Sequence, residues 1–388
     1  MDNELSRFES ISPYSDEEAV KALGEVSRHP FIPIVSKALF PDEKPGYLAQ
    51  ALRSIGSIDE FQSVIMSKAV DWCIENTIHN FSYDGISNLQ GIDGKFLMMS
   101  NHRDIIVDPA ITQYVLLQNG IPMSEICVGD NLLSSKTAER LLRSNRMIKV
   151  IRGISARELY LSSQLLSEYI RQTITSGKSS VWIAQRQGRT KNGIDITEQG
   201  LLKMFDMSGT GTFKDNFEEL NIVPLSISYE YEPCDIRKAR ELLISRTQNY
   251  VKTKNEDAHS IVIGIRQLKG NVHLNIGSPL TAEEIEAASH CDIKNDRYQA
   301  IRHAVDIRVV EGYKLWKTNY MAYDIVHGGS AFADRYSAED MESFKAYVEH
   351  KLNKVERSLD RDELRDIFLH IYSNPVDTKL SFKAERNC

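Results

Sequence analysis

Cysteine is scarce in this sequence, and no two cysteines stand at a spacing typical of a metal site. The 388 residues include five cysteines, an odd number with no C-x-x-C pair among them. Disulfide frameworks and zinc sites depend on paired or closely spaced cysteines, so the scatter favours reduced thiols in a cytosol. The sequence therefore predicts no bound metal. The cysteines are Cys73, Cys127, Cys234, Cys291 and Cys388.

Long apolar runs and an excess of positive charge are missing as well. No stretch approaches the roughly 18 consecutive apolar residues of a membrane-spanning helix. Residues 1–20 are acidic and lack the apolar core of a secretory signal. We therefore expect a cytoplasmic protein, with peripheral contact to the inner face of the cell membrane left open. The formal net charge of −7 argues against a general nucleic-acid binder.

The pattern of apolar residues divides the chain into three regions. Residues 1–90 are predicted to be a helical segment, residues 91–334 an α/β domain and residues 335–388 a helical C-terminal extension. In the middle region short apolar runs alternate with amphipathic stretches, which predicts a mostly parallel sheet flanked by helices. The expected strands are 96–101, 181–185, 222–231, 261–268 and 272–277, and the expected helices are 109–118, 137–147, 156–176, 236–253 and 295–318.

The stretch Ser100–Pro109, SNHRDIIVDP, ends the first apolar run of that domain. A kinase catalytic loop needs Asn at the fifth position after the Asp of H-R-D, but Pro109 stands there and the chain has no D-F-G. Two interpretations remain: a base–carboxylate pair for acyl transfer, or a solvated turn beside a helix cap. Asp108 before Pro109 predicts a helix N-cap, which puts His102 on a strand-to-helix loop where open α/β sheets bind ligands. A nearby carboxylate fixes the imidazole tautomer, so His102 could accept a proton from a substrate hydroxyl.

Two basic clusters follow further along the chain. Lys149 and Arg152 flank an apolar pair that is expected to be a short strand, and a loop after 181–185 carries Arg186, Arg189 and Lys191. Guanidinium groups match the geometry of phosphate, so these strand-end cations suit an anionic ligand. The alternative for each cluster is an ordinary solvated face. The run 229–232, YEYE, is predicted to be only the end of a strand.

With these features in place, the sequence resembles the glycerol-phosphate acyltransferases, which include the 1-acylglycerol-3-phosphate (lysophosphatidate) acyltransferases. The family's blocks have counterparts in order over residues 95–232: Asn101-His102 with Asp108, the strand before Arg152, the loop 183–193, and a strand with Pro224. The His–Asp gap is five residues here instead of four, and Gln187 stands where the family carries Glu. Asp108 is the expected partner of His102, with Asp104 as the alternative carboxylate, which could instead pair with Arg103.

The resemblance implies a reaction and its participants. His102 is expected to be the general base oriented by Asp108, and Arg152 and Arg189 to bind the acceptor phosphate, assisted by Arg186 and Lys191. The implied donor is acyl-coenzyme A or an acyl carrier protein, the acceptor is lysophosphatidate or glycerol 3-phosphate, and no cofactor is implied. Gln187 leaves another lipid acceptor open, and the altered His–Asp spacing leaves open a non-catalytic, lipid-binding form of the fold.

Overall fold

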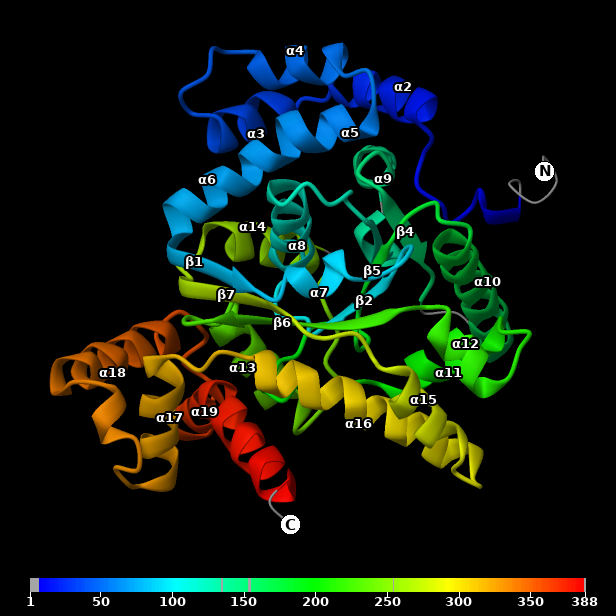
Figure 1. The fold of residues 1–388 in the computed structure, drawn as a ribbon. Helices are drawn as coiled ribbons and strands as arrows, with labels where there is room; N and C mark the ends of the chain where they lie inside the picture. Colours follow the sequence, from blue (N-terminus) through cyan, green and yellow to red (C-terminus); the bar gives the residue numbers. More distant parts are fainter. Residues whose placement is uncertain (1–6, 134, 153–154, 254, 387–388) are drawn as a thin grey trace.

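The computed structural model describes residues 7–133, 135–152, 155–253 and 255–386. Across these ranges a seven-stranded sheet runs in the order β1-β7-β6-β2-β5-β3-β4. Every neighbouring pair is parallel except β6 with β7. The predicted mostly parallel α/β fold is therefore confirmed (Figure 1). The strands are β1 (Ile78–Asp84), β2 (Leu97–Ser100), β3 (Glu125–Gly129), β4 (Met147–Val150), β5 (Val181–Ala184), β6 (Ile222–Tyr229) and β7 (Gly270–Ile276).

Helices lie before, around and after this sheet. The first group is α2 (Asp16–Val26), α3 (Ile32–Leu39), α4 (Tyr47–Ser54), α5 (Ile58–Glu60), the π-helical η1 (Phe61–Met66) and α6 (Ser67–Thr77). The second is α7 (Ser87–Gln90), α8 (Val107–Gln118), the 3₁₀ turn η2 (Asp130–Leu133), α9 (Lys136–Arg143), α10 (Ala156–Thr175), α11 (Gln199–Met207), α12 (Phe213–Glu218), α13 (Asp235–Ser245), α14 (Glu256–Arg266), α15 (Ala282–Ser289) and α16 (Lys294–Gly312). The last is α17 (Lys317–His327), η3 (Ala333–Arg335), α18 (Ala338–Leu352) and α19 (Arg361–Arg386).

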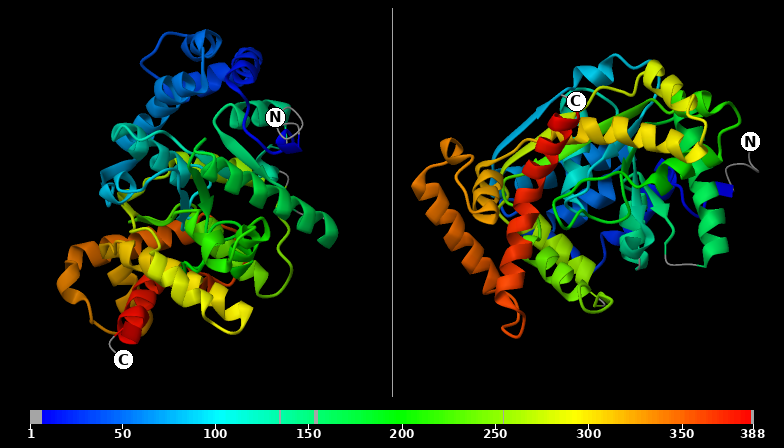
Figure 2. Two further views of the ribbon diagram at one scale, coloured as in Figure 1. Left: turned by 45° about the vertical axis from the view of Figure 1, so that its right-hand side comes forward. Right: turned by 90° about the horizontal axis from the view of Figure 1, so that it is seen from below.

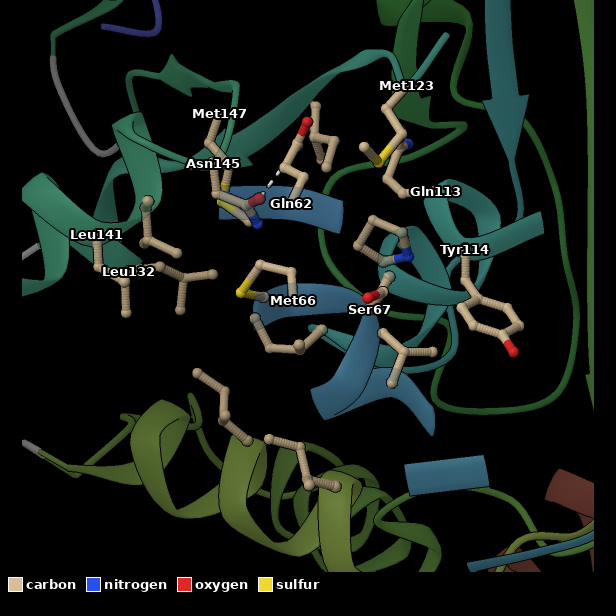
Figure 3. A pocket seen from close by; sticks show the side chains of 18 of the residues that line it. Gln62, Met66, Ser67, Gln113, Tyr114, Met123, Leu132, Leu141, Asn145 and Met147 are labelled. Carbon is tan, nitrogen blue, oxygen red and sulfur yellow. Dashed lines mark hydrogen bonds between the residues drawn. The ribbon is translucent and has the colours of Figure 1, made fainter. Parts of the chain in front are cut away.

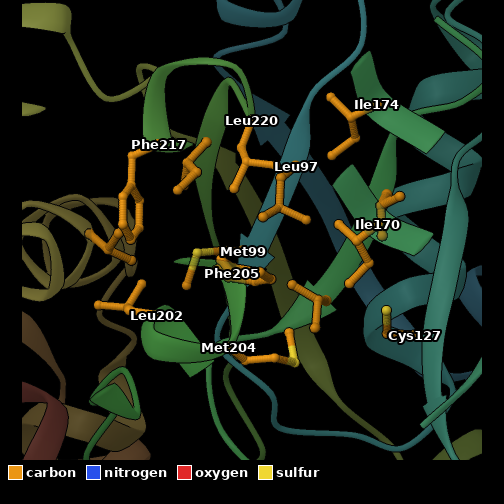
Figure 4. Close-up of a cluster of buried hydrophobic side chains, with 14 of the residues drawn as sticks. Leu97, Met99, Cys127, Ile170, Ile174, Leu202, Met204, Phe205, Phe217 and Leu220 are labelled. Atoms are coloured by element: carbon orange, nitrogen blue, oxygen red, sulfur yellow. The ribbon is translucent and has the colours of Figure 1, made fainter. Parts of the chain in front are cut away.

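The alternation of side chains along the central strands explains why helices cover both faces of the sheet. Leu97 and Met99 of β2 point into one core together with α10, α11 and α16 (Figure 4). Met98, between them, points into the core on the opposite face, with α6 and α8. Each of these three side chains is fully buried. A parallel strand that is buried on both faces is apolar at consecutive positions, as β2 is.

The N-terminal helices and the C-terminal helices have apolar cores of their own. Leu23, Leu52 and Phe61 belong to the first of these, and Phe344 and Phe368 to the second, which α13 and α17–α19 build together. The two groups lie on opposite sides of the sheet (Figures 1 and 2). In the described part of the chain, no helix combines the length and the hydropathy needed to cross a bilayer.

Several expected elements differ in the structure, among them the helix expected over 236–253, which ends at Ser245. Residues 261–268 were expected to be a strand from their β-branched residues, but 261–266 belong to α14, whose first turn carries Glu256 and Asp257. Acidic residues in a first turn favour a helix through its dipole, against the local β propensity of this run. The segment 1–90, expected to be helical, contains β1, and the helix expected over 295–318 ends at Gly312 before α17 begins.

Candidate active site

His102, on the loop that connects β2 to α8, meets Asp108 in the first turn of α8. The Nδ1 atom of His102 lies 3.0 Å from Oδ2 of Asp108, whose side chain is only 1% exposed. An ionised carboxylate can only accept hydrogen bonds, so Nδ1 carries the proton and Nε2 keeps its lone pair. His102 also lines a cavity of about 110 Å³. The loop thus presents a hydrogen-bonded imidazole to a space that a small polar group can fill.

The Asp108 carboxylate is held by more donors than the histidine alone. The backbone N–H groups of Arg103 and Asp104 donate to Oδ2 at 2.6 and 2.8 Å. The hydroxyl of Tyr229 donates to Oδ1 at 2.6 Å. Because the loop curls around the carboxylate, the five-residue gap still lets the pair meet. Tyr229, expected to be only a strand end, therefore helps to position Asp108. Burial, together with the charge of Asp108, raises the pKa of the Tyr229 hydroxyl well above its usual value.

Asp104 has a different task from the alternative considered for it. Its Oδ1 accepts the backbone N–H groups of Ile106 and Val107, each at 2.9 Å, and so caps the start of α8. The helix begins at Val107, so the expectation that Asp108 is the N-cap is wrong. Asp108 stands in the first turn, where its side chain is free to face His102. Asp104 does not pair with Arg103, contrary to the alternative expectation.

Arg103 anchors the loop through a buried network of charges that was not expected from the sequence. Its guanidinium contacts Asp195 at 2.7 Å and Glu232 at 3.2 Å, and Lys238 contacts Glu232 at 2.5 Å. Burial opposes the charge of Arg103, but Asp195 and Glu232, with nearby Tyr313, hold its pKa well above the usual value. Two cations and two anions balance in this cluster. Removing one partner from such a buried pair typically costs about 3–5 kcal/mol.

Asn101 completes the support for the end of β2. Its side chain exchanges hydrogen bonds with the backbone of Ile227 in β6 and donates to Asp195 at 2.9 Å. Thr190 donates its backbone N–H to the carbonyl of His102 at 2.7 Å. The loops that follow β2 and β5 are thereby fixed against each other. His102 is consequently held on a rigid frame.

The structure brings three of the four predicted binding residues to the His102 cavity. Arg152, Arg189 and Lys191 line it, whereas Arg186 does not. Burial lowers the pKa of Arg152, an effect that the nearby carboxylates of Asp130, Asp257 and Glu198 oppose. The Lys191 ammonium pairs with Glu241. Arg152 and Arg189 are thus the cations best placed for an anion in this cavity.

Two buried donors in the cavity wall have no hydrogen-bond partner among the described residues. They are one terminal nitrogen of Arg189 and the indole Nε1 of Trp182. A buried donor without a partner costs about 1–3 kcal/mol, and a ligand that accepts the bond removes this cost. The His102 ring lies edge-on to Trp182, with centroids 6.0 Å apart. The cavity is therefore prepared for an acceptor-rich ligand beside the imidazole.

Sequence reasoning missed several residues of this site. Lys252 and Asp257, which pair at 2.7 Å, come from the far end of the domain and also line the cavity. No spacing in the sequence links them to His102. The backbone N–H of exposed Gln187 donates to the carboxylate of Glu198 at 3.0 Å. Glu198, eleven residues later, therefore supports the loop with a carboxylate, which the side chain of Gln187 lacks.

A second cavity of about 310 Å³ adjoins the first and is lined almost wholly by apolar side chains (Figure 3). It lies between α8, α9 and α14 and the N-terminal helices, which contribute Met66 and Val70. Gln62 and Asn145 share a hydrogen bond of 3.1 Å and are among its few polar residues. Five residues line both cavities, so the two share a wall beside the His102 loop. They are Ile106, Pro109, Ile126, Leu132 and Met147.

No group of three or more His, Cys, Asp or Glu side chains in the described ranges is arranged to hold a metal ion. No protein-family model matches the chain, and no curated protein matches its sequence. Among solved structures, the 1-acyl-sn-glycerophosphate (LPA) acyltransferase PlsC from Thermotoga maritima is similar, with a TM-score of 0.39 and 11% identity over 76% of this chain and 95% of that chain. A likeness this distant carries no argument about chemistry. The case for a function therefore depends on the geometry of the site itself.

Proposed function

We propose that this protein is an O-acyltransferase that moves an acyl group from a thioester to a glycerol phosphate acceptor. The acyl donor in this proposal is acyl-coenzyme A or an acyl carrier protein. The acceptor is lysophosphatidate or glycerol 3-phosphate. His102 acts as general base and Asp108 orients it.

The observation that carries the proposal is the meeting of two unlike cavities at one histidine loop. On one side, Arg152 and Arg189 line a small cavity of mixed polarity, and their guanidinium groups match the phosphate of an acceptor. On the other side lies an apolar space of about 310 Å³ that suits an alkyl chain. Each CH₂ group buried there contributes about 0.8 kcal/mol. A phosphate-bearing acceptor together with the acyl chain that it receives fits this pair of cavities better than a wholly polar substrate does.

The proposed chemistry needs no protein nucleophile. The acceptor hydroxyl gives its proton to Nε2 of His102 while its oxygen attacks the thioester carbonyl carbon. The carbon–sulfur bond then breaks, and the leaving thiolate recovers the proton from the imidazolium. Asp108 stabilises the imidazolium while it lasts. The products are an ester and a free thiol, so atoms and charges balance.

The test is thioester consumption by the purified protein with glycerol 3-phosphate and with lysophosphatidate as acceptors. General-base catalysis typically contributes about 10²–10⁴-fold, and His102→Ala should lose a factor of that order. His273→Ala is the matched control, because His273 also hydrogen-bonds its neighbours but lines no cavity with Arg152. Retained binding of lipid without turnover by the wild type would instead favour a non-catalytic protein. Turnover only with a different lipid would correct the acceptor.

A further inference from the structure

A third cavity, about 880 Å³ in volume, opens between α13, α14 and the end of α18. Its size falls within the range of about 300–1,000 Å³ that is typical of small-molecule sites. Five lysine or arginine side chains line it, against two glutamates. In a chain of net charge −7 this is a local reversal of sign. The cations are Arg237, Arg240, Arg266, Lys351 and Lys354.

Some of these charges are already neutralised by partners. Arg240 binds Glu356, with its closest nitrogen 2.6 Å from the carboxylate, and Lys351 contacts Asp235 at 2.8 Å. Glu256 accepts the Tyr250 hydroxyl at 2.8 Å. These groups build the walls of the cleft and are not available to a ligand.

The other three cations have no carboxylate partner among the described residues. Arg237 makes only a 3.4 Å contact with Nδ1 of His259, and neither Arg266 nor Lys354 makes an ion pair. They come from three separate walls: α13, the last residue of α14, and the turn after α18. Cations that converge from three sides on one concavity favour a ligand with several negative charges.

The cleft also contains aromatic surface. Tyr250 and Tyr347 both line it and are half-buried. Their hydroxyls donate to Glu256 and Asp235, so the rings are held in place. The Tyr347 ring already packs against Tyr231, with centroids 4.7 Å apart, and against Lys351, whose Nζ lies 5.0 Å from its centroid. The Tyr250 ring is therefore the one that offers a flat face to a planar base. Phosphates with a planar base are the chemistry of a nucleotide.

The cleft and the His102 cavity lie on the two sides of one short segment. Tyr250, Thr253 and Glu256 face the cleft, whereas Lys252 and Asp257 line the His102 cavity. Cys234 lines the cleft too; burial raises the pKa of its thiol, and the charge of nearby Arg189 opposes that shift. A ligand in the cleft is therefore one thin wall away from the proposed reaction site.

We propose that this cleft binds the 3′-phosphorylated adenosine diphosphate part of coenzyme A, so that the acyl donor is a coenzyme A thioester. This identification rests on the proposed acyl transfer, since that reaction requires a thioester carrier. In this arrangement the three uncompensated cations bind the phosphates, and the Tyr250 ring stacks on the adenine. The flexible arm of the donor then crosses the segment at Lys252 toward His102. An acyl carrier protein is disfavoured because these cations line a concavity, whereas a protein partner needs an open surface.

Calorimetric titration of the full-length protein with adenosine 3′,5′-bisphosphate and with coenzyme A tests this proposal without any turnover. We expect both to bind, more weakly as salt is raised. Arg266→Gln and Lys354→Gln should each raise Kd about tenfold, a change of about 1.4 kcal/mol. Lys345→Gln is the matched control, because Lys345 is an exposed lysine of α18 outside the cleft and pairs with Glu342. His102→Ala should bind as the wild type does.

Each other outcome has a definite meaning. No binding of either nucleotide overturns the proposal, and so does binding that Arg266→Gln and Lys354→Gln leave unchanged. Binding of an acidic acyl carrier protein in place of the nucleotides would make that protein the donor carrier. Nucleotide binding by a protein that transfers no acyl group would keep this site and reject the proposed reaction instead.

Discussion

Of the four described histidines that contact an aspartate, His102 and His273 are the two least exposed, and only His102 is placed to act as a base. His102 contacts Asp108 at 3.0 Å, and that carboxylate is 1% exposed. His273 lies 3.4 Å from Asp84, which is 58% exposed. Nδ1 of His273 shares a hydrogen bond of 2.8 Å with the Ser82 hydroxyl, and its Nε2 faces Asp84, so neither ring nitrogen is free. Nε2 of His102, by contrast, faces a cavity without a protein partner among the described residues.

The comparison shows that residue types alone do not define a catalytic pair. A useful base needs a free nitrogen, an ionised partner shielded from water, and room for a substrate. The His102 pair has all three, with four donors on its carboxylate and a cavity beside the ring. The pair of His273 is a cross-strand contact between β1 and β7 at the edge of the sheet.

Removing the charge from each carboxylate should give the largest contrast. Asp108→Asn is expected to lower kcat by about 10²–10⁴-fold, because the amide no longer fixes the imidazole tautomer or stabilises its cation. Asp84→Asn should leave kcat unchanged. Steady-state rates of thioester consumption measure both. Asp104→Asn keeps an oxygen for the helix cap and should have little effect; a large loss there would move the orienting role to Asp104.

Deleting the hydroxyl that supports each pair should give the next largest contrast. Tyr229→Phe leaves Oδ1 of Asp108 buried without a donor, which should cost about 1.5–3 kcal/mol in the free energy of unfolding. It should also displace the pH–rate profile, which a purely structural residue would not do. Ser82→Ala, its counterpart beside His273, should leave the profile unchanged. Denaturant titration and rates from pH 5 to 9, roughly the range over which histidine titrates, separate these outcomes.

The contact between His102 and Asp108 could be predicted from the sequence, whereas most of the contacts around it could not. His102, Asp108 and the strand-end cations follow from local features, because carboxyl ends of parallel strands gather at one edge of a sheet. Lys252, Asp257 and Tyr229 reach the site through contacts between distant segments, which no local pattern records. Helix α14 was wrongly expected to be a strand because its conformation, too, depends on contacts with distant segments.

The reason lies in the packing of α14. Gly264 stands so close to the His102 loop that an added Cβ would lie 2.1 Å from Oδ2 of Asp104. That close approach is a tertiary contact, and it places the helix where the β-branched run 261–263 suggested a strand. The cavity walls formed by Ile261 and Ile265 depend on the same placement.

Filling the apolar cavity gives a third contrast between the two histidine pairs. Two cavities adjoin the His102 loop, whereas the His273 pair lines neither of them. Ala110 lines the apolar cavity but not the His102 cavity. Ala110→Phe should therefore reduce kcat/KM for long-chain donors by about fourfold for every CH₂ group excluded, from 0.8 kcal/mol each. Short-chain donors should be unaffected. Ala287→Phe, at an exposed position of α15, is the control. If Ala110→Phe instead lowered kcat/KM equally for all chain lengths, the cavity would not hold the acyl chain.

The smallest expected effect is on the pH dependence of stability. Burial lowers the pKa of His273 from 6.5, opposed by Asp84. The unfolded chain therefore takes up a proton at a higher pH than the folded protein does, so stability is complete above the unfolded pKa and is lost as the pH falls below it. His273→Gln should flatten the decline of Tm between pH 7 and 5, on the acid side of the unperturbed histidine pKa of about 6.5. An identical slope in the variant would mean that His273 is as free to ionise in the folded protein as in the unfolded chain, and its burial would then have no energetic consequence.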